Sequence, residues 1–219
     1  MKKSTLLCVA ATCVLSISAQ AHTIEYVLDA PTRGSVFMLY LLEGFKHIIP
    51  LGVDHILFIL CIFFLNTQLK PILLQASMFT LAHTITLGLS MYGIIQLPAG
   101  IVEPLIALSI VLLAVENMFY REVRPHRLIT VFIFGLVHGM GFAGALSDLG
   151  MPSNAFFTAL ISFNLGVELG QISIILLMYY LVTRKYSQKA WYRAKLVLPL
   201  SIFIAIVAGY WTIERLLSQ

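Results

Sequence analysis

Histidine and aspartate residues are clustered at the start of a long apolar run. The stretch GFKHIIPLGVDHILFILCIFF, residues 44–64, contains His47, Asp54 and His55. Imidazole nitrogens and carboxylate oxygens bind divalent transition metals, and both groups can also carry protons. This pattern predicts a functional site, and the residue types alone leave a metal site and a proton site as alternatives.

Three further ionisable residues lie inside later apolar runs: His83, His138 and Glu168. An ionisable group within a membrane is costly, so each is a candidate functional residue. Glu168 is near the middle of its predicted span, and most of the ionisable residues, including His47, Asp54 and His55, fall in the same half of theirs. We therefore expect the six residues to be metal ligands of one site. The alternative for each histidine is a hydrogen bond to a neighbouring carbonyl group.

Three other polar residues are expected to orient these ligands without binding the ion. Asn164 and Gln171 lie on the same helical face as Glu168, because the spacing is i, i+4 and i+7. Glu103 precedes Pro104 near the start of another apolar run. Side chains that hold metal ligands in place are a regular part of such sites. The alternatives are a contact between helices for Glu168 and a helix-start acid for Glu103.

Cysteine usage restricts the choice of metal. Cys8 and Cys13 lie in the first 21 residues, which leaves Cys61 alone in the remaining chain. Imidazole and carboxylate ligands without thiolates suit Ni²⁺, Co²⁺, Zn²⁺ or Fe²⁺ better than Cu(I). The expected substrate or cofactor is a divalent transition metal ion, with nickel, cobalt and zinc as the candidates.

The composition predicts the elements that hold these residues. Hydrophobic residues make up 59% of the 219 residues and charged residues only 11%, whereas soluble domains contain about a quarter charged residues. Long apolar segments cover about 53–66, 71–91, 99–119, 128–147, 154–182 and 195–214. We predict an all-α polytopic membrane helix bundle with about six spans and one domain over residues 22–219.

The N-terminal segment, residues 1–21, resembles a secretory signal peptide. Lys2 and Lys3 precede a short apolar run, and Ala19-Gln20-Ala21 is a small-x-small cleavage pattern. His22 would then begin the mature chain. The alternative is an uncleaved first membrane helix.

Basic residues predict the orientation of the spans. The formal net charge is +4, and the surplus lies in short loops, where it indicates membrane orientation and not nucleic-acid binding. Every second connection carries Lys or Arg. We expect a multi-pass protein of a bacterial-type inner membrane, in contact with lipid, with both mature termini outside the cytoplasm. The sequence leaves open whether the protein forms a homo-oligomer.

This alternation fails if residues 35–49 form a complete span, because every later loop would then change sides. We therefore expect 35–49 to be a re-entrant piece, or the outer part of one helix broken at Pro50-Leu51-Gly52. The apolar segment 53–66 is about 21 Å long as a helix, shorter than the roughly 30 Å hydrocarbon core. Broken helices are used to build ion sites within membranes.

Five motifs in this order resemble the HupE/UreJ family of membrane proteins. They are GFKHIIPLGVDHILF, FTLAHTITL, VEPLIALSIVLLAVEN, FGLVHGMGFAGAL and FNLGVELGQ, and together they span most of residues 44–171. The resemblance implies a link with the nickel supply of hydrogenase and urease. Ile48 stands where nickel-permease members have proline, and Ile59 where they have methionine. The sequence thus resembles a second branch of the family.

Three functions agree with these residues. The first is a permease for a divalent metal, with His47, Asp54 and His55 as the entry site and His83, His138 and Glu168 deeper in the core. The second is a zinc-dependent membrane hydrolase, in which the metal activates a water molecule. The third is an accessory protein of a metalloenzyme. The resemblance favours nickel or cobalt transport.

Overall fold

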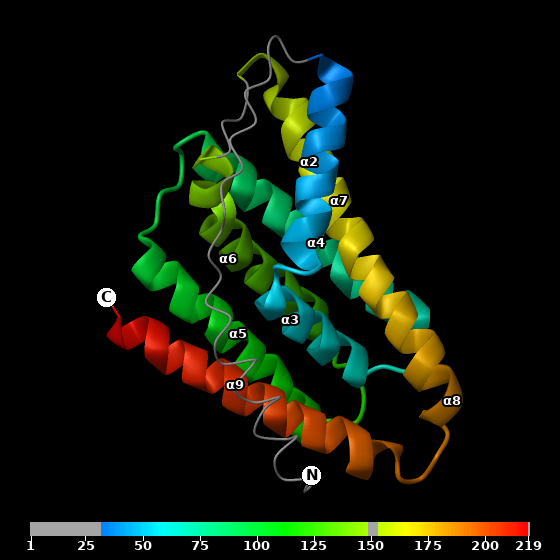
Figure 1. Ribbon diagram of the computed structural model, residues 1–219. Helices are drawn as coiled ribbons and strands as arrows, with labels where there is room; N and C mark the ends of the chain where they lie inside the picture. Colours follow the sequence, from blue (N-terminus) through cyan, green and yellow to red (C-terminus); the bar gives the residue numbers. More distant parts are fainter. Residues whose placement is uncertain (1–31, 149–152, 219) are drawn as a thin grey trace, which may run out of the picture.

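The computed structural model describes residues 32–148 and 153–218 of the chain (Figure 1). Within them, every regular element is helical: α2 (Arg33–Ile48), α3 (Val53–Phe64), α4 (Leu69–Met91), α5 (Ala99–Phe119), α6 (Arg127–Asp148), η1 (Ser153–Ala155), α7 (Phe156–Met178), η2 (Tyr179–Thr183), α8 (Arg184–Tyr186), η3 (Arg193–Val197) and α9 (Leu198–Leu217). The predicted signal peptide and His22 lie outside the described residues.

Five helical segments are long and apolar enough to cross a membrane: Leu69–Met91, Ala99–Phe119, Arg127–Ser147, Phe156–Tyr186 and Arg193–Leu217. Helices α2 and α3 pass the same test together as a pair bent by 68°. These findings confirm the predicted all-α polytopic bundle. The bend also lies where the sequence predicted a broken helix, between residues 48 and 53.

The break between α2 and α3 keeps its backbone groups bonded. The amide of Ile49 donates to the Phe45 carbonyl over 2.9 Å, and the amide of Ile56 donates to the Gly52 carbonyl over 2.8 Å. Gly52 lies directly against the backbone carbonyl of His47, where a Cβ atom would collide with it. Since free backbone groups are costly in lipid, these bonds lower the cost of a bend within a membrane.

Helix α3 is short and lies in the centre of the bundle. Its 12 residues extend about 18 Å, and it contacts α2, α4, α5, α7 and α9. Phe58, Cys61 and Phe63 are fully buried. Protein therefore surrounds the second half of α3, whereas Pro50 and Leu51 at the break before it are exposed.

Glycines allow two helix pairs to approach closely. Gly166 of α7 lies against the backbone of α2, where an added Cβ atom would collide with the Leu41 carbonyl. Gly139 of α6 lies in the same way against the His83 carbonyl of α4. Such contacts between small residues are a common basis of helix packing in membranes. The two pairs bring α2, α4, α6 and α7 together around the candidate site.

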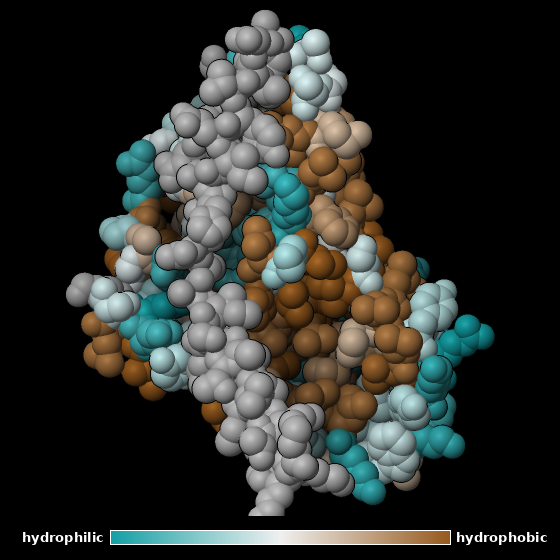
Figure 2. Space-filling view, viewed as in Figure 1, coloured by the Kyte–Doolittle hydropathy of each residue, from teal (hydrophilic) through white to brown (hydrophobic). Residues whose placement is uncertain are grey.

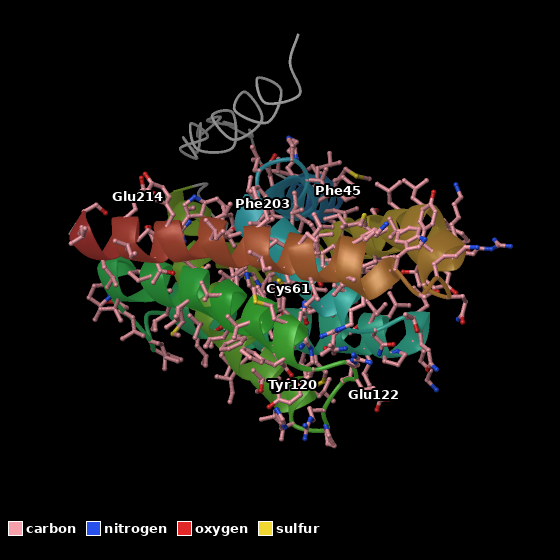
Figure 3. The ribbon with its side chains drawn as sticks, turned by 90° about the horizontal axis from the view of Figure 1, so that it is seen from below. Phe45, Cys61, Tyr120, Glu122, Phe203 and Glu214 are labelled. Atoms are coloured by element: carbon pink, nitrogen blue, oxygen red, sulfur yellow. The ribbon has the colours of Figure 1, made fainter. Side chains whose placement is uncertain are left out.

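One end of the bundle carries the connections rich in Lys and Arg, such as those with Arg121 and Arg124 and with Lys185 and Lys189. It is called the basic end below. Hydrophilic residues gather there around α8, whereas apolar residues cover most of the face formed by α2 and α7 (Figure 2). Large apolar side chains such as Leu81, Ile129 and Ile206 are exposed on the helix surfaces. Helix α9 runs alongside α5, with Cys61 enclosed within the bundle and Glu122 in a connection at its edge (Figure 3). The exposed apolar side chains on the outer helix faces are suited to contact with lipid.

Candidate metal centre

Three histidines from three helices meet in the middle of the bundle. One ring nitrogen of each of His47 (α2), His55 (α3) and His83 (α4) lies within 4.8 Å of those of the other two. His55 and His83 are buried, and His47 is partly buried. The bend between α2 and α3 makes this possible, since it turns His47 back over the start of α3. The ring centroids of His47 and His55 are 4.6 Å apart.

Asp54 fixes the tautomer of His55. The Asp54 carboxylate accepts a hydrogen bond from the His55 amide over 2.9 Å, and the same oxygen lies 3.2 Å from Nδ1 of the ring. Because a carboxylate only accepts, Nδ1 carries the hydrogen and Nε2 keeps a lone pair. The Nε2 atom of His55 is buried and has no hydrogen-bond partner among the described residues.

Asn164 fixes the tautomer of His83 in a similar way. Nδ2 of Asn164 donates to the Leu160 carbonyl over 2.8 Å, which leaves Oδ1 as the acceptor that lies 3.0 Å from Nδ1 of His83. Nδ1 of His83 therefore donates, and Nε2 keeps its lone pair. This Nε2 atom is again buried without a hydrogen-bond partner in the described part of the chain.

His138 of α6 is the fourth buried imidazole. Ser109 Oγ donates to the Ile106 carbonyl over 2.7 Å, so it accepts from Nε2 of His138 over 3.0 Å. Nδ1 of His138 then holds a free lone pair, and no described residue bonds it. The rings of His55 and His138 are 5.1 Å apart between centroids. His138 thus lies beside the three-histidine cluster.

Aromatic rings enclose the histidines on two sides. Toward the basic end, Phe58 and Phe79 pack with centroids 4.7 Å apart, and Phe79 lies 5.0 Å from His138. On the opposite side, Phe142 and Phe163 stack at 5.1 Å, and Phe142 lies 3.9 Å from His47. The low dielectric that these rings create strengthens any interaction between a cation and the site.

The donor set fits a divalent transition metal. Neutral imidazole is a common ligand of zinc, nickel and related ions, and a carboxylate or amide on the other ring nitrogen is its usual support. Imidazole nitrogens on one tetrahedral ion lie about 3.4 Å apart. One ring nitrogen of each of His47, His55 and His83 lies within 4.8 Å of the other two, which is of the same order. The buried nitrogens without partners are the observation that favours a ligand.

Glu168 lies in a different group of contacts. Its carboxylate accepts from Ser77 over 2.6 Å and from Thr80 over 2.5 Å. Gln171 donates to the Thr80 hydroxyl over 3.1 Å. No described hydrogen bond joins Glu168 to a histidine, so its role as a metal ligand stays a prediction. Asn164, predicted as a support, does contact His83.

Glu103 is exposed on α5. Its backbone carbonyl accepts a hydrogen bond from Arg215 over 3.1 Å, and no described hydrogen bond joins its side chain to the histidine cluster. The predicted role of Glu103 in supporting a metal ligand therefore stays a prediction. Ser109, which sequence reasoning missed, instead supports His138 from the same helix. A lone serine in an apolar run gives no signal of such a role.

Toward the basic end, a second polar group ties four helices together. Arg127 is fully buried and binds Glu116 over 2.6 Å, Gln75 over 3.0 Å and the Cys61 carbonyl over 2.9 Å. Asn117 donates to the same carbonyl. Cys61 is in the last turn of α3, where carbonyl groups lack helical partners and cations are favoured. Arg127 is the first residue of α6, and its buried side chain stabilises the end of α3.

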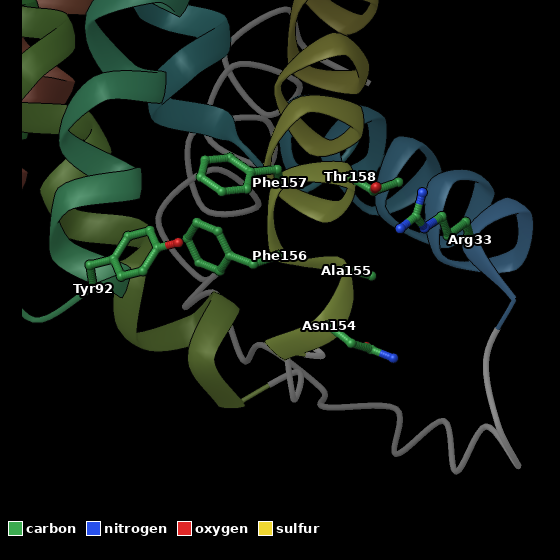
Figure 4. Close-up of a pocket in the computed structure, with 7 residues that line it drawn as sticks. All are labelled: Arg33, Tyr92, Asn154, Ala155, Phe156, Phe157 and Thr158. Carbon is green, nitrogen blue, oxygen red and sulfur yellow. The ribbon is translucent and has the colours of Figure 1, made fainter.

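A shallow surface hollow lies at the end opposite the basic connections (Figure 4). Its volume is about 300 Å³, and it is lined by Arg33, Tyr92, Asn154, Ala155, Phe156, Phe157 and Thr158. The rings of Tyr92 and Phe156 lie side by side with centroids 4.4 Å apart. None of the seven residues is a histidine or a carboxylate. The hollow is therefore separate in chemistry from the histidine cluster.

Comparison with protein families decides the identity of the chain. The family model described as HupE / UreJ protein matches residues 20–215. The chain belongs to the HupE/UreJ family. Neither the search of curated proteins nor the search of solved structures found a match.

Membership in the HupE/UreJ family agrees with the resemblance of the five sequence motifs. Members of this family are membrane proteins related to nickel or cobalt transport, and the chain is a membrane protein of that class. All four buried histidines and Asp54 lie within the matched residues. The family therefore joins the geometry in favouring a divalent transition metal.

Proposed function

We propose that this HupE/UreJ protein is a permease for a divalent transition metal ion, with Ni²⁺ or Co²⁺ as the favoured substrate. His47, His55 and His83 would bind the ion in the middle of the membrane. Asp54 and Asn164 would hold the rings in the ligating orientation. His138 would receive the ion or complete its coordination.

One observation carries this proposal. Four imidazole rings lie close together in an apolar interior, and each has a buried nitrogen without a hydrogen-bond partner among the described residues. For His55, His83 and His138, the other nitrogen is bonded in a way that leaves this one with a lone pair. Buried polar atoms are rarely left unpaired unless a ligand meets them.

The surroundings suit a transported ion. The aromatic side chains of Phe58, Phe79, Phe142 and Phe163 border the cluster on two sides, where they would act as barriers to an ion. A carrier needs such barriers, because a site open to both sides at once would act as a channel. We propose that the ion enters from the end opposite the basic connections.

Metal binding to the purified protein tests the proposal. We expect equilibrium dialysis to find one Ni²⁺ or Co²⁺ per chain. His55→Ala and His83→Ala should each lower the affinity by at least about tenfold, because each removes a ligand. His126→Ala is the matched control: this histidine is exposed in a connection, and its removal should leave the affinity unchanged.

Transport is measured separately in proteoliposomes. We expect wild-type protein to carry Ni²⁺ or Co²⁺ across the membrane and the double variant His83→Ala plus His138→Ala to lose this uptake. Unchanged uptake by the double variant would overturn the role of these histidines. Tight, stoichiometric metal without any flux would contradict the permease function.

A zinc-dependent hydrolase is the second candidate, because three imidazoles with an open fourth position also form catalytic zinc sites. Against it, the carboxylate of Asp54 is engaged with His55, and Glu168 is bonded to hydroxyl groups. Asp54 thus supports a ligand, and no described hydrogen bond joins Glu168 to the histidine cluster, so neither carboxylate is seen beside the metal position as the base that such chemistry needs. Retention of zinc during chelation, without flux, would favour this candidate.

A further inference from the structure

Residues 184–195 connect η2 to η3 at the basic end and are called the α8 loop below. The loop carries five positive side chains, on Arg184, Lys185, Lys189, Arg193 and Lys195. The whole stretch between Glu168 and Glu214 contains no acidic residue. Among the described residues, no ion pair involves any of the five side chains. The loop therefore has a surplus of positive charge without a carboxylate bound to it.

The α8 loop is anchored to the bundle, and its other basic side chains point outward. Arg193 is partly buried and donates to the carbonyl groups of Asn117 and Met118 at the end of α5, over 3.0 Å in each case. The remaining four basic residues are exposed, and hydrophilic residues gather around α8 at the surface (Figure 2). A fixed loop with several exposed cations is suited to binding an anionic group.

Two aromatic side chains lie among these cations. Tyr186 and Trp191 are both exposed, and their rings pack with centroids 5.5 Å apart. Tyrosine and tryptophan are favoured at the interface between hydrocarbon and water, because their rings are apolar and carry one polar group. Membrane orientation requires only basic residues on this side. The exposed aromatic pair indicates in addition that the loop contacts the lipid headgroup layer.

The length of the adjoining span places the loop at the same level. The apolar segment Phe156–Tyr186 has 31 residues, which extend about 46 Å as a helix. This length agrees with the roughly 40–45 Å of a bilayer that includes its headgroup regions. Phe156 lies at the end opposite the basic connections. Tyr186 and the cations that follow it therefore reach the lipid phosphates at the basic end.

We propose that the α8 loop binds the headgroups of anionic phospholipids. Their phosphate carries a net negative charge, whereas the ammonium group of phosphatidylcholine cancels it. Each lysine or arginine near an anionic membrane surface favours binding by about fivefold. An acidic soluble protein is the other partner that positive charge alone would suit, and the aromatic pair favours lipid. This inference does not rest on the proposed function.

Fluorescence quenching at Trp191 tests the inference. The chain has two tryptophans, Trp191 and Trp211, so Trp211→Phe leaves Trp191 as the reporter. The protein is placed in mixed vesicles in which either phosphatidylglycerol or phosphatidylcholine carries brominated chains. We expect phosphatidylglycerol to be enriched around Trp191 by at least about fivefold. Equal quenching by the two lipids would overturn the inference, as would the absence of quenching, which would leave the loop to a soluble partner.

Variants in the Trp211→Phe background identify the groups that bind. Replacing Arg184, Lys185 and Lys189 together by glutamine should reduce the enrichment to less than about twofold. The charge-conserving replacement by lysine, arginine and arginine should keep it. Arg33→Gln is the matched control, because Arg33 is exposed at the opposite end and its loss should have no effect. Full enrichment in the triple glutamine variant would overturn the role of these side chains.

A soluble competitor separates lipid from free phosphate. Glycerol phosphate in excess should not lower the enrichment, because it lacks the acyl chains that hold a headgroup at this level. Loss of the enrichment would show that the loop binds free phosphate and would contradict the assignment to lipid. The comparison of the two brominated lipids needs no loop variant, so the inference stays testable if the triple glutamine variant does not fold.

Discussion

Asn164 offers a test of the site that leaves every histidine in place. Its Oδ1 atom accepts from His83, and its own amide is fixed by the Leu160 carbonyl. Asn164→Ala frees the His83 ring to rotate and to change tautomer, so the affinity for Ni²⁺ should fall about 10- to 100-fold. Asn164→Asp keeps an acceptor at this position and should retain more of the affinity. Equilibrium dialysis with purified variants measures both.

Ser162→Ala serves as the control for Asn164. Ser162 is also buried in α7, but its hydroxyl bonds only to carbonyl groups of its own helix. It should bind Ni²⁺ as the wild type does. If Asn164→Ala stays within about twofold of the wild-type affinity, below the usual effect of such supports, Asn164 does not position His83.

At this scale, the sequence pointed to candidate histidines because ionisable groups in apolar runs are conspicuous, and their function stays a prediction. It could not predict which of them lie together in one cluster. The six residues were expected in one site, with His47 at its entry and His83 deeper in the core, and the structure places these two histidines side by side in one cluster with His55. The difference arises from the bend of 68°, whose angle no residue pattern encodes. The hydroxyl partners of Glu168 and His138 depend on how each helix is rotated about its own axis. An almost uniformly apolar sequence gives little indication of this rotation.

The pairing of α2 with α7 is the element on which the site depends, because it delivers His47. Gly166 lies where any side chain would meet the Leu41 carbonyl of α2. We expect Gly166→Ala to destabilise the protein by about 1–3 kcal/mol through overpacking. It should also weaken Ni²⁺ binding, since α2 must move away and take His47 with it. Thermal unfolding in detergent and equilibrium dialysis provide the two measurements.

Gly209 in α9 is the matched control for Gly166. No heavy atom lies within 4 Å of a Cβ atom added there. Gly209→Ala should therefore be neutral or stabilise the helix by up to about 1 kcal/mol, because alanine favours the helical state. Equal melting temperatures for Gly166→Ala and the wild type would show that α2 and α7 can separate without cost, against the close approach seen here.

For the whole molecule, the described residues contain five helices that are long and apolar enough to cross a membrane, and six crossings if the bent pair counts as one span. Hydrophobic run length and the alternation of basic loops predicted this number, because both reflect the thickness of the bilayer and the cost of moving charge across it. The same physics predicts the sidedness. The basic end should face the cytoplasm, and the end with the hollow of Figure 4 should face outward.

Cysteine labelling checks this sidedness in cells whose outer membrane is permeabilised and whose inner membrane is intact. With the native cysteines replaced by serine, single cysteines are introduced at Arg33, Gln96 and Lys189, three exposed positions. A membrane-impermeant maleimide should label Arg33→Cys and Gln96→Cys directly, and Lys189→Cys only after permeabilisation. Position 33 is decisive for the bent pair: if α2 and α3 each crossed the membrane, Arg33→Cys would lie on the side of Lys189→Cys. Labelling of positions 33 and 96 from the same side therefore requires a single crossing between Arg33 and the start of α4, which is what the bent pair provides if it forms one span.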